Sequence, residues 1–141
     1  MAADPTVPSP TPNPEPVRPL RVLYADDVRE LRELITHVLA RDGHRVETVQ
    51  DGRLAWERLS TDAAYDLLIT DHHMPNMNGL ELVRHVKGSP YRGKIVVFSS
   101  ELSPIVHARY RAYGVDLVMP KPVFPPVLRK AIRELFAPQP V

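Results

Sequence analysis

The sequence contains no cysteine, which excludes disulfide bonds, zinc–thiolate sites and cysteine nucleophiles and fits a reducing compartment. Net charge is also nearly absent: 18 basic and 17 acidic residues leave +1, so no basic surface predicts a nucleic-acid partner. No apolar run approaches the roughly 20 residues of a membrane span. The N-terminus lacks the apolar core of a signal peptide. We therefore expect a cytoplasmic protein with no nucleic-acid or membrane partner.

Proline is unevenly distributed, with seven of the 16 prolines among the first 19 residues. Because proline lacks an amide donor and interrupts helices and sheets, residues 1–18 are predicted to form an extended, disordered tail. This tail is interpreted as a tether, with a proline-motif ligand for a partner as the alternative. Residues 19–137 have the length and composition of one globular domain, followed by a short tail at 138–141.

Apolar runs alternate with segments of helical periodicity along the domain. Strands are predicted at 20–25, 45–49, 66–70, 94–99 and 115–119, and helices at 28–41, 53–59, 79–87, 104–112 and 127–136. Five strand–helix alternations indicate an α/β fold, a doubly wound parallel sheet covered by helices on both faces. In such sheets, ligands bind beyond the carboxyl ends of the strands.

Polar side chains stand at the carboxyl ends of four predicted strands: Asp26 and Asp27, Asp71, Ser99, and Lys121. Three clustered carboxylates repel one another unless their charge is compensated, and a divalent ion with oxygen ligands, Mg²⁺ or Mn²⁺, would compensate it. A carboxylate beside such an ion can act as a nucleophile and form an acyl phosphate. Lys121 would then neutralise the transferring group, and the Ser99 hydroxyl would hydrogen-bond a phosphoryl oxygen.

The acidic pair, the stretch ITDHHMPNMNG, the stretch VVFSS and the dipeptide KP occur in this order between positions 26 and 122. Together they resemble the receiver domain of two-component response regulators, in a single-domain form similar to the chemotaxis regulators. The resemblance covers about residues 20–136. It implies a flavodoxin-like three-layer sandwich with five helices and the strand order 2-1-3-4-5.

The resemblance also implies a role for each matching position. Asp71 matches the phosphorylated aspartate, Ser99 matches the switch hydroxyl, and Lys121 matches the partner of the phosphoryl group. Asp27 matches the direct metal ligand, and Asp26 matches a ligand that acts largely through water. His73 matches the position whose main-chain carbonyl binds the metal. The Lys121–Pro122 peptide is expected to be cis.

The implied function is a phospho-acceptor switch and not an enzyme with turnover on other substrates. A sensor histidine kinase or a histidine phosphotransfer protein would phosphorylate Asp71, and the domain would catalyse only this transfer and its own dephosphorylation. The surface of the fourth helix, fifth strand and fifth helix would then address an unidentified protein target. Only 20 residues follow Lys121, so no DNA-binding output domain is expected there. The domain is expected to be a monomer or a weak homodimer.

Two departures from the family pattern, and other interpretations of single residues, keep alternatives open. Val118 occupies a position where the family usually has tyrosine or phenylalanine, which favours a receiver-like interaction module that is never phosphorylated. A haloacid-dehalogenase-like phosphohydrolase would also use a nucleophilic aspartate, but it needs an acid where this chain has His73. Taken alone, Asp26 and Asp27 could cap the helix that follows, and His72 with His73 could suggest a metal site, although neighbouring side chains diverge.

Overall fold

The structure is a computed structural model, described for residues 18–100 and 103–138. It contains a parallel five-stranded sheet in the order β2-β1-β3-β4-β5, which confirms the predicted fold class and strand order. The strands are β1 (Arg21–Ala25), β2 (Arg45–Val49), β3 (Leu67–Asp71), β4 (Lys94–Ser99) and β5 (Leu117–Pro120). The helices are α1 (Arg29–Arg41), α2 (Gly52–Thr61), α3 (Gly79–Lys87), α4 (Pro104–Ala112) and α5 (Pro125–Phe136).

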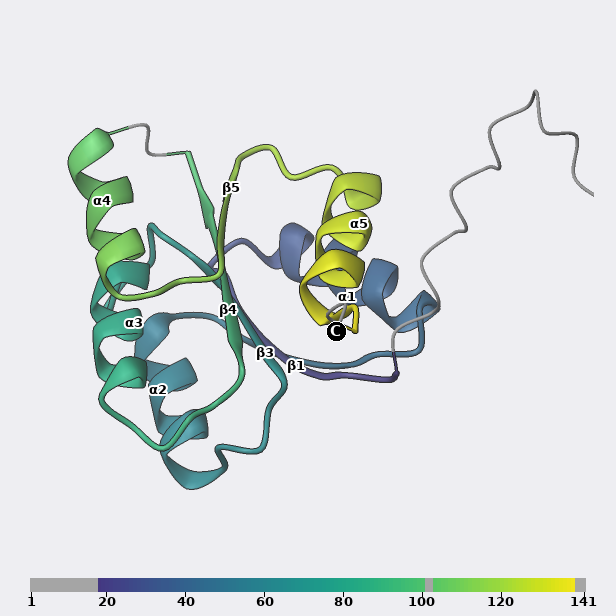
Figure 1. Cartoon of the computed structure of the whole chain (residues 1–141), viewed down its shortest axis with the longest axis horizontal. Helices are drawn as coiled ribbons and strands as arrows, with labels where there is room; N and C mark the ends of the chain where they lie inside the picture. Colours follow the sequence, from purple (N-terminus) through teal and green to yellow (C-terminus); the bar gives the residue numbers. More distant parts are fainter. Residues whose placement is uncertain (1–17, 101–102, 139–141) are drawn as a thin grey trace, which may run out of the picture.

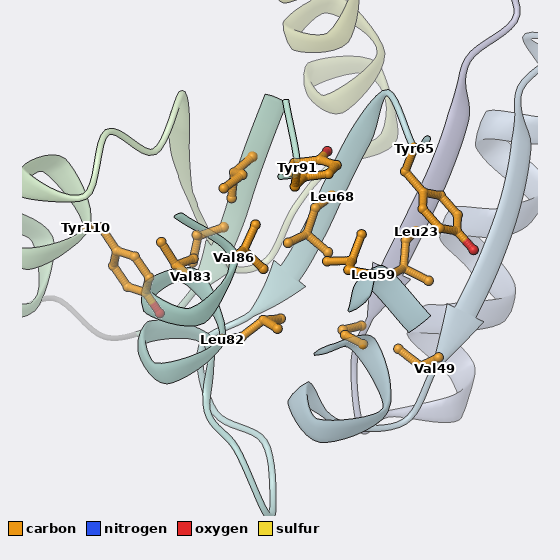
Figure 2. Packing of buried hydrophobic residues seen from close by; sticks show 14 residues of the cluster. Leu23, Val49, Leu59, Tyr65, Leu68, Leu82, Val83, Val86, Tyr91 and Tyr110 are labelled. Carbon is orange, nitrogen blue, oxygen red and sulfur yellow. The ribbon is translucent and has the colours of Figure 1, made fainter. Parts of the chain in front are cut away.

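The helices cover both faces of the sheet, with α1 and α5 on one side and α2, α3 and α4 on the other (Figure 1). Strand residues alternate between the two faces, so each strand contributes to two cores. The core under α2–α4 is drawn in Figure 2 and includes Leu23, Leu68 and Val83. The core under α1 and α5 includes Val22 and Leu128. The central strand β3 is buried along its whole length, as a parallel strand between two helical layers should be.

Strands β1 and β3 and helix α1 differ from the prediction by one residue. Three elements differ by two residues at one end, and each of these differences has a local cause. Strand β5 begins at Leu117 and not at Val115, because the Val115 N–H donates to the Tyr110 carbonyl and so closes the end of α4. Gly114 supplies the positive φ of 75° that this helix end requires. Helix α5 begins two residues before the predicted start, because prolines occupy its first positions, where their missing N–H has no partner to lose.

The third difference is in α2, which is longer than predicted at both ends and runs from Gly52 to Thr61. Asp51 caps its N-terminus, and its side chain accepts a hydrogen bond from the Leu54 N–H at 2.8 Å. Leu34 of α1 is 43% exposed, although the spacing of the apolar residues between Leu31 and Leu39 would place it on the buried face.

Two sequence expectations at the sheet edge are confirmed. Strand β5 is an edge strand, which explains why it tolerates Pro120. The Lys121–Pro122 peptide is cis. The predicted tails lie almost wholly outside the described residues. Arg18, at the start of the described chain, pairs with Asp66 at 2.9 Å. Among the described residues, no helix has the length and apolar character needed to cross a membrane.

Candidate phosphoryl and metal site

The polar residues singled out in the sequence gather at the carboxyl edge of the sheet. Asp71 is the last residue of β3 and lies opposite Phe98 of β4 in the parallel register. Ser99 follows Phe98 and is 2% exposed. The Lys121 N–H donates to the Ser99 carbonyl at 3.0 Å, which fixes the start of the β5–α5 loop beside the end of β4. The strand order therefore brings side chains from distant parts of the chain into one crevice.

Three carboxylates share this crevice. Asp26, Asp27 and Asp71 each offer an oxygen atom, and these atoms all lie within 4.8 Å of one another. Asp26 and Asp71 are buried, whereas Asp27 is exposed. Two oxygens bound to one Mg²⁺ at about 2.1 Å each can be at most about 4.2 Å apart. The donor set therefore fits a magnesium ion after a closure of about half an ångström or with one acid bound through water.

Lys121 supplies the positive charge of the crevice. Its Nζ lies 3.0 Å from Asp71 Oδ2 and 3.9 Å from Asp26 Oδ2. Burial raises the pKa of Asp71 above its ordinary value, while the hydrogen bond and charge of Lys121 act against this shift. The negative charge of Asp26 adds to the rise. Asp71 is thus a desolvated carboxylate whose charge is only partly compensated by protein groups.

Asp26 is held in place by interactions that the sequence analysis missed. The Tyr24 hydroxyl donates to Asp26 Oδ2 at 2.6 Å, and the Val28 N–H donates to Oδ1 at 2.9 Å. Arg32 donates to the Asp26 carbonyl at 2.8 Å. Tyr24 is fully buried, and its pKa is raised by burial and by the carboxylate it contacts. A tyrosine inside an otherwise aliphatic strand, two residues before an acid, was the available signal.

The loop between β3 and α3 is fixed at both ends. The His72 N–H donates to the Phe98 carbonyl at 2.9 Å, and the Gly79 N–H donates to the His72 carbonyl at 2.9 Å. Within the loop, the Asn76 side chain donates to Asp51 Oδ2 at 3.0 Å, and Asn76 adopts a positive φ of 68°. The loop therefore holds a defined shape next to Asp71.

The two histidines after Asp71 differ in exposure, but their side chains do not diverge as expected, because the two rings pack edge to face with centroids 4.7 Å apart. His72 is 7% exposed, and its Nδ1 hydrogen-bonds the hydroxyl of Tyr110 on α4. His73 is exposed and lies in the loop. The metal-ligand role of the His73 main-chain carbonyl stays a prediction. The hydrogen bond of His72 could not be predicted from the sequence, because its partner is 38 positions away.

At the opposite end of the loop, Asn78 caps α3, and its side chain accepts from the Glu81 N–H at 2.9 Å. Val118 is partly buried against the core under α2–α4. Val118 therefore serves as a packing residue at the position where the family usually has an aromatic side chain.

Comparison with known proteins identifies the family of this chain. The family model of the response regulator receiver domain matches residues 22–133. The two-component response regulator ORR3 of Oryza sativa subsp. indica is 39% identical over 116 residues, covering 81% of this chain and 86% of that protein. The chemotaxis response regulator CheY4 of Vibrio cholerae is a structural neighbour with a TM-score of 0.76 and 31% identity, covering 83% of this chain and 98% of the other.

Other relatives are much longer than this chain. It is 36% identical over 129 residues to the sensor histidine kinase AruS of Pseudomonas aeruginosa, where the match covers 89% of this chain but only 13% of the relative. The match therefore concerns a single segment of that kinase. With a family model spanning most of its length and relatives that it covers nearly end to end, this chain belongs to the family of response regulator receiver domains of two-component signalling.

Proposed function

We propose that the domain is a signalling switch in which Asp71 accepts a phosphoryl group from a phosphohistidine. The observation that carries this proposal is the buried Asp71 carboxylate, which lies 3.0 Å from the Lys121 ammonium and within 4.8 Å of two further acids. A carboxylate oxygen attacks phosphorus, the bond from phosphorus to the histidine nitrogen breaks, and an acyl phosphate forms. The departing imidazole keeps the electron pair of that bond.

Mg²⁺, or Mn²⁺, would be held by Asp26, Asp27, Asp71 and the main-chain carbonyl of His73. The ion neutralises charge on the transferring oxygens when it is bound. Tyr24 keeps the Asp26 carboxylate oriented toward the crevice. Lys121, which contacts Asp71 in the unmodified protein, would transfer its charge to a phosphoryl oxygen.

Ser99 would donate its hydroxyl to the phosphoryl group from the end of β4. Its 2% exposure and its place beside the Lys121 main chain support this role. Hydrolysis of the acyl phosphate would be the only turnover, so the domain is proposed to be a switch and not an enzyme acting on other molecules.

The phosphoryl donor is proposed to be a sensor histidine kinase or a histidine phosphotransfer protein. A groove of about 450 Å³ beside the site supports such a docking partner, because Tyr24, Leu31 and Leu34 line one part of it. Lys121 and Val123 also line it, so the groove reaches the lysine that contacts Asp71. An apolar helix face seated between α1 and the β5–α5 loop would bring a histidine close to Asp71. A cytoplasmic location follows from this choice of donor.

The output is proposed to be the surface formed by α4, β5 and α5, which would bind an unidentified protein after phosphorylation. The modification replaces a carboxylate of one negative charge by an acyl phosphate of about two negative charges and three further oxygens, and that change biases an existing equilibrium between two conformations. The domain would act as a monomer or a weak homodimer.

A second function is favoured by Val118. A receiver-like interaction module that is never phosphorylated would need no aromatic residue at that position. The complete set of Asp26, Asp27, Asp71, Ser99 and Lys121 supports the phosphorylated switch instead, because an unphosphorylated module has no use for three carboxylates that repel one another.

Uptake of a phosphoryl group from acetyl phosphate tests the proposal. Intact-mass spectrometry should show one added phosphoryl group in the wild type with Mg²⁺ and none in the Asp71→Asn variant. Asp116→Asn is the matched control, because Asp116 directly precedes β5 and lies at the amino ends of the strands, away from the site. This variant should be phosphorylated like the wild type. An unmodified wild type under conditions that phosphorylate a known receiver domain would favour the interaction module.

A further inference from the structure

Helix α4 is attached to the domain by few side chains. Of its nine residues, all described, only Tyr110 is fully buried. Val106 is partly buried, and Ile105 is 68% exposed. Figure 2 shows the Tyr110 ring at one border of the core, reaching from α4 toward α3. The position of α4 therefore depends mainly on what holds Tyr110.

The Tyr110 hydroxyl lies where three segments meet. It hydrogen-bonds Nδ1 of His72, the residue directly after Asp71. It also lies over Gly79, the first residue of α3, where an added Cβ would be 2.7 Å from the hydroxyl and 2.6 Å from the Asp71 carbonyl oxygen. No side chain separates the main chain of Asp71 from α3 and the Tyr110 hydroxyl. A displacement of the Asp71–His72 peptide therefore acts on both the start of α3 and the Tyr110 hydroxyl.

We propose that the hydrogen bond between Tyr110 and His72 holds α4 in its resting position and breaks when Asp71 carries a phosphoryl group or its mimic. This inference rests on the proposed function, since it concerns how the same site is read. Tyr110 acts through His72 and is a positioning residue, without contact to the phosphoryl group. The link takes a route through α4 that does not involve Val118 of β5.

The charge of Asp71 also acts on the Tyr110 hydroxyl, which supports the coupling inferred from the geometry. Burial raises the pKa of Tyr110, and the negative charge of Asp71 contributes to the rise, so the hydroxyl senses the acceptor carboxylate. Phosphorylation adds further negative charge at that position. The occupation of Asp71 by a phosphoryl group or its mimic and the position of α4 are then coupled. Because coupling is reciprocal, a hydrogen bond that must break when Asp71 is occupied lowers the affinity for the group that occupies it.

The probe is beryllofluoride with Mg²⁺, which adds to the acceptor carboxylate without covalent turnover. Amide hydrogen exchange of α4 should become faster in the wild type when the probe binds. In Tyr110→Phe, exchange should already be fast without the probe and should not change when it is added. Tyr113→Phe removes a hydroxyl from the end of the same helix, and it should behave like the wild type.

Affinity provides the second measurement. Because one hydrogen bond no longer has to break, Tyr110→Phe should bind the probe on the order of two- to tenfold more tightly than the wild type in calorimetry. Tyr113→Phe should keep the wild-type affinity.

Substitutions of His72 separate the hydrogen bond from general packing. An asparagine places its terminal atoms at the same number of bonds from the main chain as Nδ1, whereas a glutamine extends one bond further. His72→Asn should therefore keep the slow exchange of α4, and His72→Gln should behave like Tyr110→Phe. These variants also serve as the test if Tyr110→Phe does not fold.

The outcomes distinguish this inference from the function on which it rests. If the wild type does not bind beryllofluoride, the proposed function fails. If the wild type binds it but α4 exchange does not change, or if Tyr110→Phe and His72→Gln retain the wild-type response, the proposed function stands and the coupling through Tyr110 is wrong.

Discussion

Replacement of Gly79 by alanine should destabilise the domain through the contact between β3 and α3. The added Cβ would lie 2.6 Å from the Asp71 carbonyl oxygen, 2.7 Å from the Tyr110 hydroxyl and 3.0 Å from the His72 Cα. Two of these neighbours are main-chain atoms, and the third belongs to a fully buried side chain. None of them can move away freely, so the helix, the strand end or α4 must shift.

The magnitude follows from two opposing effects. Overpacking of a well-filled interior costs about 1–3 kcal/mol, and this site belongs near the upper end because main-chain atoms are involved. A glycine-to-alanine change in a helix returns about 0.5–1 kcal/mol. We expect a net loss of about 1–2.5 kcal/mol, which corresponds to a melting temperature lower by roughly 3–12 °C for a domain of this size.

Gly88→Ala is the matched control at the other end of the same helix. The nearest atom to its added Cβ is 3.6 Å away, and its φ of −87° suits alanine. This variant should be unchanged or more stable by about 0.4–1 kcal/mol. Thermal and denaturant unfolding measured together check both variants. Equal stability of Gly79→Ala and Gly88→Ala would refute the proposed close contact at the start of α3.

Three further substitutions test the surroundings of the site. Tyr24→Phe leaves Oδ2 of the buried Asp26 without its 2.6 Å donor and should cost about 1.5–3 kcal/mol of unfolding free energy in urea titrations. Asp51→Ala removes the α2 cap and the partner of Asn76, so it should cost about 1 kcal/mol and weaken Mg²⁺ binding measured by calorimetry. The folded-state pKa of Asp71 is raised, so its contribution to stability is greatest below the ordinary value of 3.8 and is lost as pH rises through the folded value. Asp71→Asn should therefore gain stability relative to the wild type over that window when unfolding is followed without Mg²⁺; a constant difference from pH 3 to 8 would contradict the shift.

The sequence was informative where the physical signal is local or follows from strand topology. Apolar periodicity located all ten elements, and parallel strands necessarily bring Asp26, Asp71, Ser99 and Lys121 to one edge. The cap at Asn78 is a local signal of the same kind, because capping depends on residues three positions apart. The cis Lys121–Pro122 peptide came from the family resemblance and not from local physics.

What the sequence could not supply depends on contacts between segments far apart in the chain. The hydrogen bond of His72 to Tyr110 joins positions 38 residues apart, and no periodicity encodes it. The contact of Tyr24 with Asp26 is local in the sequence. A tyrosine in a buried strand is nevertheless interpreted as a core residue unless the partner of its hydroxyl is known. Element ends shifted where helix closure at Gly114 and the proline start of α5 overrode the apolar pattern.

The central claim is that Asp71 is a phosphoryl acceptor in a magnesium-dependent site. Its most direct test is binding of beryllofluoride followed by fluorine NMR in the wild type and in Asp71→Asn. We predict one set of bound fluorine resonances in the wild type that requires Mg²⁺ and is absent from Asp71→Asn. Bound resonances that persist in Asp71→Asn, or a wild type that binds none at any Mg²⁺ concentration, would contradict the claim.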